Sequence, residues 1–268
     1  MKIEVLVSTY NDGFNNIVFN DDFYYLIIHQ VDAELSSKYL DAFNFKFSRN
    51  DKVRYIQCID EKGLSKSRNV ALENAVGDYL WIMDDDVEIF KNSYQLISQM
   101  ISREKLDTSV WVLNYTTKSE DVSAYNLKNV KKRNLSLWDS FHVCSINMLM
   151  KASDIEGIRF DEKFGLGSAY PSGEEYIYIS DVIKGKLKVR QTSLVASKHP
   201  PVSSGDDFYS KKNVTAAKVE MLKRVHGKLG HLIFFAFFLK KIRYLLKKKA
   251  LITYVRNVIA FYAERRNF

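Results

Sequence analysis

Three consecutive aspartates, Asp84 to Asp86, are the residues best suited to chemistry, and they directly follow the apolar run YLWIM. Carboxylates side by side repel by about 4 kcal/mol at 4 Å when the effective dielectric is near 20, so something must offset the charge. Side chains alternate along a strand, which predicts Asp84 and Asp86 on one side and Asp85 on the other. Two converging carboxylates form a hard oxygen site for Mg²⁺ or Mn²⁺, whose remaining positions a diphosphate can fill. A solvated acidic turn is the alternative.

A second acidic pair, Glu174 and Glu175, opens the segment EEYIYISDVIKG, which predicts a helix capped by Ser172 and ended by Gly185. The helix dipole stabilises both carboxylates as anions, whereas burial raises a carboxyl pKa towards general-base strength. A capping pair with no catalytic role is the alternative. His199 in SKHPP is a further candidate ligand for a metal or phosphate, although a lone histidine is more often structural.

The elements that must position these residues alternate between strands and helices. Strands are predicted from short apolar runs rich in β-branched and aromatic residues, at 3–8, 23–29, 53–59, 79–84 and 110–115. Helices are predicted at 63–77, capped by Ser65 and ended by Gly77, and at 91–104. This alternation predicts an α/β fold with a mostly parallel sheet covered on both faces. Ligands of such sheets bind beyond the carboxyl ends of the strands, where the three aspartates lie.

The remaining segments carry weaker signals. Residues 115–140 are polar and poorly periodic, which indicates a loop-rich insertion over the site, and residues 144–155 resemble a strand that feeds a short helix. Cys58 and Cys144 have no disulfide or metal-ligand spacing. Both are expected to be reduced core residues of a cytosolic protein. The N-terminal run leads into Asn-Asp-Gly, which is typical of a strand and not of a signal peptide.

Basic residues are concentrated near the end of the chain. Residues 205–268 contain 15 Lys and Arg against 4 Asp and Glu, whereas the first 204 residues contain 25 and 28. A basic tail on a weakly acidic body indicates contact with an anionic surface, either membrane phospholipid or nucleic acid. No nucleic-acid-binding motif accompanies the charge, so we expect no nucleic acid partner.

Residues 207–268 are predicted to be helical throughout. A single helical face of residues 231–249 carries Leu232, Phe235, Phe238, Leu239, Ile242 and Leu245. Clustered bases surround this face, which is typical of an interfacial helix that meets an anionic membrane, here through residues 231–268. A helical hairpin packed on the rest of the chain is the alternative. No charge-free apolar run reaches the ~18 residues of a spanning helix.

The segment GLSKSRNVALENAVGDYLWIMDDDVEI resembles the donor-binding region of inverting glycosyltransferases of family two, which have the GT-A fold. The matching parts are Arg68-Asn69, the Gly77-Asp78 turn and an Asp-x-Asp motif at Asp84 to Asp86. VSTYN resembles the start of the family's first strand, with Ser8 in place of proline. The stretch FDEKFGLGSAYPSGEEYIYISDVIKGKLKV resembles the family's acceptor-side segment. Together these motifs span roughly residues 3–199.

The family's usual Asp-Asp-Gly-Ser after the second strand is absent, and YLIIHQVDAE stands in its place. Gln30 can replace an aspartate there as a partner of the nucleobase, because its amide both donates and accepts. The resemblance implies a donor site of Thr9, Tyr10, Gln30, Arg68, Asp84 and Asp85. It also implies that Asp86, with Asp84 and His199, holds Mn²⁺ or Mg²⁺, that Glu175 aligns with the catalytic base, and that Glu174 precedes it. Trp138 and Tyr170 are candidates for stacking on sugar rings, although such aromatics are more often core.

These expectations describe an inverting, metal-dependent glycosyltransferase that moves a sugar from a nucleotide-diphosphate donor, expected to be a UDP-sugar. The acceptor would be a hydroxyl of a saccharide or lipid-linked glycan in bacterial capsule, exopolysaccharide or O-antigen synthesis. The enzyme would be cytoplasmic and peripheral on the inner face of the membrane. A sugar-phosphate nucleotidyltransferase and a catalytically inactive, membrane-docked adaptor of the same fold are the alternatives.

This interpretation divides the chain into two parts. Residues 1–204 would form the GT-A catalytic domain, with a nucleotide-sugar-binding half at about 1–114 and an acceptor half at 115–204. Residues 205–268 would form a helical, basic, amphipathic extension.

Overall fold

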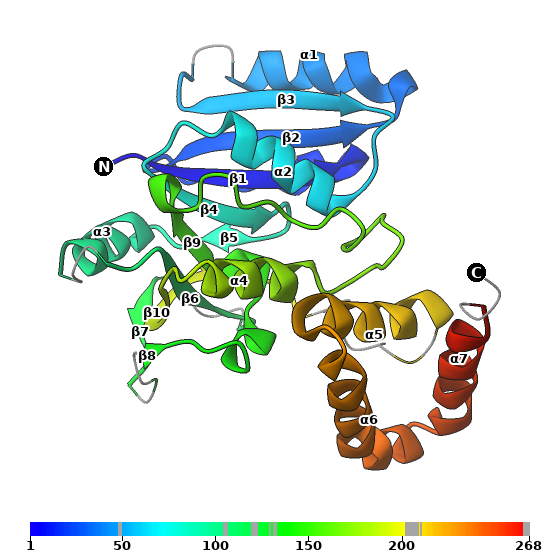
Figure 1. The fold of residues 1–268 in the computed structure, drawn as a ribbon. Coiled ribbons are helices and arrows are strands. Elements are labelled where there is room, and N and C mark those ends of the chain that lie inside the picture. The colour runs from blue at the N-terminus through cyan, green and yellow to red at the C-terminus, as the bar shows by residue number, and fades with distance from the viewer. Residues whose placement is uncertain are drawn as a thin grey trace.

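The computed structural model describes residues 1–47, 50–103, 107–118, 123–128, 130, 133–201, 209 and 211–264. Its centre is one mixed sheet (Figure 1). The strands are β1 (Ile3–Tyr10), β2 (Tyr24–Val31), β3 (Val53–Ile59), β4 (Tyr79–Asp84), β5 (Glu88–Ile89), β6 (Val110–Thr116), β7 (Tyr125–Asn126), β8 (Arg133–Asn134), β9 (Met148–Lys151) and β10 (Val189–Lys198). The α-helices are α1 (Ser36–Phe47), α2 (Leu64–Asn74), α3 (Ser93–Arg103), α4 (Glu174–Lys184), α5 (Lys212–His226), α6 (Leu229–Lys247) and α7 (Leu251–Glu264).

The sheet order is β3-β2-β1-β4-β9-β6-β10-β5, with β7 and β8 also paired to β10. Strands β1 to β4 run parallel to one another, β9 is antiparallel to β4 and β6, and β10 is parallel to β6. The predicted α/β architecture is therefore confirmed, with more antiparallel pairing than the mostly parallel sheet that was expected, and all five predicted strands are present. The carboxyl ends of β1 to β4 meet at one edge of the sheet, which is where ligands bind in such folds.

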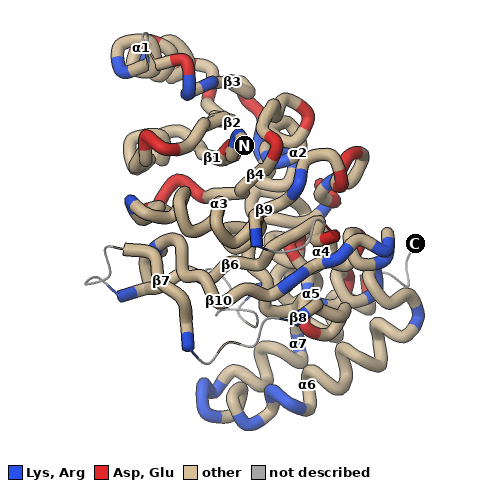
Figure 2. Tube along the Cα trace, turned by 90° about the vertical axis from the view of Figure 1, so that its left-hand side faces the viewer, with Lys and Arg blue, Asp and Glu red and all other residues tan. Residues whose placement is uncertain are grey.

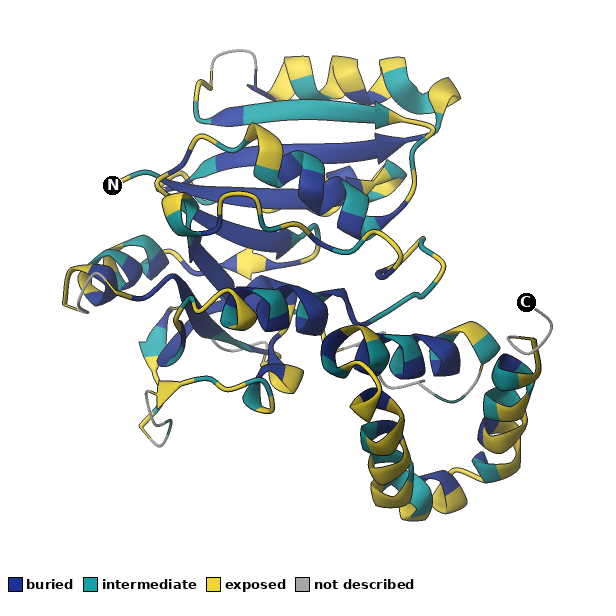
Figure 3. Cartoon of the chain, in the orientation of Figure 1, coloured by how far each residue is buried: buried dark blue, intermediate teal, exposed yellow. Residues whose placement is uncertain are grey.

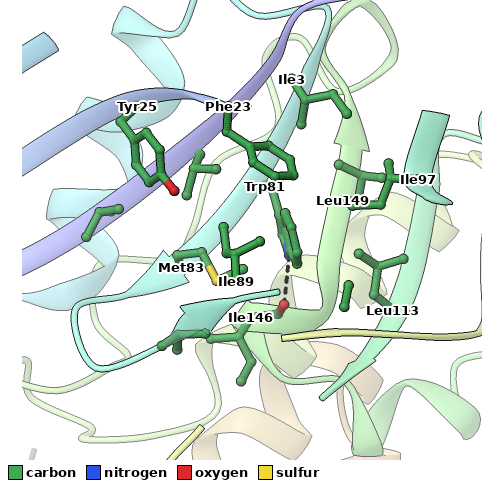
Figure 4. Packing of buried hydrophobic residues seen from close by; sticks show 14 of the residues in the cluster. Ile3, Phe23, Tyr25, Trp81, Met83, Ile89, Ile97, Leu113, Ile146 and Leu149 are labelled. Atoms are coloured by element: carbon green, nitrogen blue, oxygen red, sulfur yellow. Dashed lines mark hydrogen bonds between the residues drawn. The ribbon is translucent and has the colours of Figure 1, made fainter. Parts of the chain in front are cut away.

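Helices cover both faces of the sheet, as predicted. One hydrophobic cluster joins the inner side chains of α1 and α3 to one face, and a second joins those of α2 and α4 to the other. Figure 3 shows the central strands largely buried, with α1 exposed on its outer side and α4 almost entirely buried. Trp81 lies at the centre of the first cluster, where its indole Nε1 donates to the carbonyl of Ile146 at 2.9 Å (Figure 4). This bond satisfies the buried indole and fixes β4, which leads into the aspartates.

A buried carboxylate holds the turn before β4. Glu4 accepts hydrogen bonds from the backbone N–H groups of Val76 at 2.6 Å and Gly77 at 2.9 Å, and it pairs with Arg54 at 2.8 Å. A Cβ on Gly77 would lie 2.7 Å from that of Glu4, so the close approach requires glycine. The helix that was predicted to end at Gly77 ends earlier, at Asn74.

Glycines, and not the predicted serines, precede the two helices that border the site. Gly63 precedes α2 and Gly173 precedes α4, both with positive φ. Ser65 is instead buried inside α2, where its hydroxyl donates to the carbonyl of Phe164 at 2.5 Å. The prediction of Ser65 and Ser172 as caps is therefore wrong, because packing of the 160–170 segment against α2 uses the hydroxyl of Ser65 elsewhere. Gly185 ends α4 as predicted.

One segment differs from the expectation and another agrees with it. Within 115–140, β7 and β8 pair with β10 and so extend the sheet, while residues 119–122, 129, 131 and 132 lie outside the described residues. Residues 144–155 contain the expected strand, β9, which leads into a short 3-10 helix, and a further 3-10 turn precedes the strand. Cys58 is only partly buried and Cys144 is exposed, so neither is the core residue that was expected.

The three C-terminal helices form their own hydrophobic cluster, which includes residues of α4 (Figure 1). The apolar side chains predicted on one face of α6 are partly buried and partly exposed. Leu245 is fully buried and Phe238 stacks on Tyr254 of α7, whereas Leu232 and Phe235 are more than half exposed. In the described part of the chain, no helix is both long enough and apolar enough to cross a membrane.

Candidate active site

A cleft of about 740 Å³ lies at the carboxyl ends of the parallel strands. This volume is within the range of small-molecule sites. Among the predicted site residues, those that line the cleft are Thr9, Tyr10, Gln30, Asp84, Asp85, Asp86, Glu175 and His199. Arg68 and Glu174 do not line it, because both side chains are buried behind its wall, 1% and 4% exposed respectively.

All three aspartates face the cleft, because β4 ends at Asp84 and the next two residues lie in a turn. The strand alternation expected from the sequence therefore does not extend beyond Asp84. Asp85 accepts a hydrogen bond from the Thr9 hydroxyl at 2.6 Å. Burial raises the pKa of Asp85, as do the charges of its two neighbours, while the bond from Thr9 opposes the shift. Gly13 closes over this carboxylate so tightly that a Cβ would lie 2.1 Å from it.

Asp86 faces His199 across the cleft, with its Oδ1 3.6 Å from the imidazole Nε2. The other ring nitrogen, Nδ1, lies 2.6 Å from the carbonyl of Pro200 and donates to it, so in the neutral ring Nε2 has the free lone pair. Among the described residues no group of three or more His, Cys, Asp or Glu side chains is arranged to hold a metal. A carboxylate and an imidazole nitrogen nevertheless supply two donors that suit a divalent ion, whose other positions a diphosphate can complete.

The buried side chain of Arg68 forms ion pairs with both acidic groups, the aspartates at the end of β4 and the glutamates at the start of α4. Its Nη2 donates to Asp84 at 3.0 Å and its Nη1 donates to Glu174 at 3.2 Å, while the nearest oxygen of Glu175 is 4.0 Å away. Burial disfavours the charge of Arg68, but the three carboxylates outweigh burial and raise the pKa of the guanidinium. Arg68 is thus a fixed cation inside the wall and does not project into the cleft.

The two adjacent glutamates differ in environment. Glu174 is ion-paired with Arg68 behind the cleft wall, whereas Glu175 reaches the cleft at the N-terminus of α4. Desolvation and the neighbouring Glu174 carboxylate raise the pKa of Glu175 to about 8, against the attraction of Arg68. A carboxyl with such a pKa binds and releases protons near neutral pH, as a general base must.

Tyr10 and Gln30 line the cleft near the ends of β1 and β2, where the resemblance places a nucleobase. The Gln30 amide nitrogen donates to the carbonyl of Gly63 at 3.1 Å, which fixes the orientation of the amide. Asp32, which the sequence interpretation missed, accepts from the Tyr10 hydroxyl at 2.9 Å and lies 3.6 Å from Lys62. Hydrogen bonds from Asn11 and Tyr10 lower the pKa of Asp32. Its position directly after β2, at the edge where ligands bind, was the available signal.

Other residues near the site also escaped the sequence interpretation. Cys144 and Tyr115 line the cleft. Lys218 of α5 is close enough to the two glutamates for their charges to raise its pKa, although burial has the larger effect and lowers it. Of the two aromatics proposed for stacking, Trp138 is 60% exposed and Tyr170 packs on Phe164, and neither lines the cleft.

The chain is similar to known proteins in part of its sequence and in its fold. Residues 34–159 match the family model described as glycosyl transferase family 2. The structure of S. aureus TarS (1–349) with UDP has a TM-score of 0.55 and 17% identity, covering 90% of this chain and 71% of TarS. Its complex with UDP-GlcNAc gives 0.51 and 15%, with coverages of 86% and 69%.

The mannosyltransferase PcManGT from Pyrobaculum calidifontis, solved with GDP-Man and Mn²⁺, has a TM-score of 0.53 and 12% identity, covering 98% of this chain and 75% of its own. At these identities the structural likeness shows the fold alone. No curated protein sequence is significantly similar to the chain. The chain thus resembles glycosyl transferase family 2 in sequence over residues 34–159, and its fold is GT-A-like.

Proposed function

We propose that the protein is an inverting, metal-dependent glycosyltransferase that moves a hexosyl group from a UDP-sugar to a hydroxyl of a saccharide or lipid-linked glycan. The observation that carries this proposal is that one cleft joins Asp84 and Asp86, at the strand ends, to Glu175, at the start of α4. The UDP and UDP-GlcNAc bound by TarS support a uridine donor. The match of residues 34–159 to the family model favours sugar transfer over the nucleotidyltransferase alternative.

Within this proposal, Thr9, Tyr10 and Gln30 bind the nucleoside. Asp86 and Asp84, with His199, would hold Mn²⁺ or Mg²⁺, which neutralises charge on the departing diphosphate. Glu175 accepts the proton of the acceptor hydroxyl while that oxygen forms its bond to the anomeric carbon. The bond from this carbon to the diphosphate breaks on the opposite face, so the anomeric configuration inverts.

Arg68 and Glu174 act from behind the cleft wall. The guanidinium lies closer to Glu174 than to Glu175, 3.2 against 4.0 Å, so Glu174 takes most of its attraction. Glu174 is therefore the ion-pair partner of Arg68, and Glu175 is the glutamate placed in the cleft to carry the proton. We assign Glu175 as the base and Glu174 and Arg68 as positioning residues.

A thermal-shift screen of UDP-, GDP- and dTDP-sugars, with Mn²⁺ or with EDTA, tests the donor assignment. A ligand at 100 times its dissociation constant stabilises the folded protein by about 2.7 kcal/mol. We expect a UDP-sugar to raise Tm in Mn²⁺ but much less in EDTA, and Asp86→Ala to remove that difference. The exposed Asp51→Ala is the matched control and should behave as wild type. If no nucleotide sugar stabilises the protein, or if Asp86→Ala responds as wild type does, the assignment is wrong.

The C-terminal helices support a further part of the proposal, contact with an anionic membrane at the cytoplasmic face during bacterial polysaccharide assembly. Leu229, Leu232, Phe235, Leu239 and Leu246 of α6 are each more than half exposed. Lys and Arg gather at the end of α6, around Lys247 to Lys249 (Figure 2). Exposed apolar side chains beside exposed bases suit an interfacial helix, and each base near an anionic surface contributes about 1 kcal/mol.

A further inference from the structure

Four aromatic rings form a cluster beside the active-site cleft. Phe141 stacks on Tyr176 of α4 with ring centroids 4.0 Å apart, and Trp138 stacks on His226 of α5 at 5.1 Å. The Tyr176 hydroxyl and His226 Nε2 are 2.7 Å apart, which joins the two stacks. Burial lowers the pKa of His226, as does the charge of Lys184, so the ring is neutral near pH 7.

The outer rings of this cluster remain open to solvent. Trp138 is 60% exposed and Phe141 is 37% exposed, although their neighbours hold them in place. Asp139, between them, accepts hydrogen bonds from the backbone N–H of Ser136 at 3.0 Å and from Arg133 at 2.6 Å. These contacts fix the short turn that carries both rings. Two ordered aromatic rings with exposed faces form a ready stacking surface, because little side-chain freedom remains to be lost.

The cluster adjoins the cleft through two separate pieces of chain. Glu175, in the cleft, directly precedes Tyr176, and Cys144, on the cleft wall, follows Phe141 by three residues. Both pieces of chain connect the aromatic cluster to the part of the cleft wall that carries Glu175 and Cys144. The nucleoside end of the cleft, at Tyr10 and Gln30, is formed by the ends of β1 and β2 instead. The aromatic cluster is thus on the side of the general base.

We propose that Trp138 and Phe141 form a subsite for the acceptor saccharide, in which pyranose rings beyond the reacting hydroxyl stack on the two exposed aromatic faces. This inference rests on the proposed function, because it takes the ligand at Glu175 to be a sugar hydroxyl. A pyranose ring presents apolar C–H faces to the aromatics and hydroxyls to the polar rim at Arg133 and Asp139. His226 makes the C-terminal extension part of this subsite.

Intrinsic fluorescence can test the subsite directly, because Trp81 and Trp111 are buried and Trp138 is exposed. Acrylamide quenching of the tryptophan fluorescence of the full chain would be measured in the presence of four tetrasaccharides, one each of glucose, galactose, mannose and N-acetylglucosamine. We expect at least one of them to protect Trp138 from the quencher in a saturable manner. If none of the four protects Trp138, the proposal is wrong. It is also wrong if light scattering shows that the protein dimerises through Trp138 and the saccharides do not dissociate this dimer, because Trp138 would then bind a second copy of the chain.

Calorimetric titration of the protecting tetrasaccharide provides the second measurement. A stacked ring contributes about 1 kcal/mol, so Trp138→Ala and Phe141→Ala should each weaken binding about five-fold. Phe45→Ala, which removes a 93% exposed ring on α1, is the matched control and should bind as wild type. UDP-sugar stabilisation in Mn²⁺ should be unchanged in all three variants, so failure of the donor assignment would show separately. Equal affinity for Trp138→Ala and wild type would contradict the subsite.

Discussion

The difference between Glu174 and Glu175 originates in one buried cation. A buried arginine needs carboxylate partners, and Arg68 has Asp84 on one side and Glu174 on the other. With its two closer ion pairs already made, Arg68 compensates the charge of Glu175 only partly. Adjacent residues of the same type thus acquire different electrostatic environments through a difference of less than 1 Å in their distance from Arg68.

The raised pKa of Glu175 predicts a pH-dependent effect on stability. Between the ordinary value of 4.5 and about 8, the folded protein keeps a proton on Glu175 that the unfolded chain releases. The free energy of unfolding therefore falls as pH rises through this window. Glutamine does not titrate, so Glu175→Gln removes this loss of stability at high pH. The Tm of the variant minus that of the wild type should therefore be several degrees larger at pH 8 than at pH 4. Scanning fluorimetry across this range checks it, with the exposed Glu156→Gln as control; a shift that does not depend on pH would contradict the assignment.

At the scale of elements, the packing of α5 against α4 holds Glu175, the proposed base, in place. Arg224 of α5 binds Asp181 through two hydrogen bonds, at 3.1 and 2.8 Å. A Cβ on Gly173, just before α4, would lie 2.7 Å from the Met221 sulfur, and the φ of +104° at this position disfavours any other residue. The C-terminal extension therefore packs directly against the start of the helix that carries Glu175.

Gly173→Ala should accordingly destabilise the protein by about 1–3 kcal/mol, since it combines backbone strain with a steric contact. Adding Met221→Ala should not restore full stability, because the strain at position 173 remains. Urea unfolding measures both variants. Gly157→Ala, also at positive φ but with no atom within 4 Å, is a control for strain alone and should cost less. Equal losses for Gly157→Ala and Gly173→Ala would show that the contact with α5 contributes nothing.

The sequence predicted the strands with long apolar runs, such as β1 and β4, because their side chains are buried on both faces. It missed β10, whose run contains buried polar residues. Thr192 donates its hydroxyl to the carbonyl of Val112 at 3.0 Å, and such a partner on another strand cannot be identified from one sequence. The caps were missed for the same reason, since the partner of Ser65 lies 99 residues away.

The residues of the candidate site also divide into those predictable from local sequence and those that depend on distant partners. Its cleft-lining carboxylates were predictable from their position after an apolar strand or at a helix start. The buried position of Arg68 was not, because it depends on three carboxylates converging from two distant segments. The stacking of Trp138 on His226 was equally hidden, since it joins the body of the chain to its C-terminal extension.

At the scale of the whole molecule, the exposed side of α6 predicts binding to membranes. Replacing Leu232, Phe235 and Leu239 together by serine should abolish flotation with phosphatidylglycerol vesicles, because it removes three exposed apolar side chains. Leu40→Ser with Phe45→Ser, on the exposed side of α1, is the matched control and should float as wild type. Phosphatidylcholine vesicles should bind the wild type more weakly. Flotation of the triple variant at the wild-type level would rule out this surface.

The most direct test of the account is the release of UDP from a UDP-sugar in Mn²⁺, measured as a function of pH for the wild type and Glu175→Gln. We predict that the wild-type rate rises with pH through about 8, where Glu175 loses its proton, and levels off at higher pH. Glu175→Gln should lose about 100-fold or more in acceptor-dependent rate while it still binds the donor. An acceptor-dependent rate for Glu175→Gln equal to that of the wild type would contradict the assignment of Glu175 as the base.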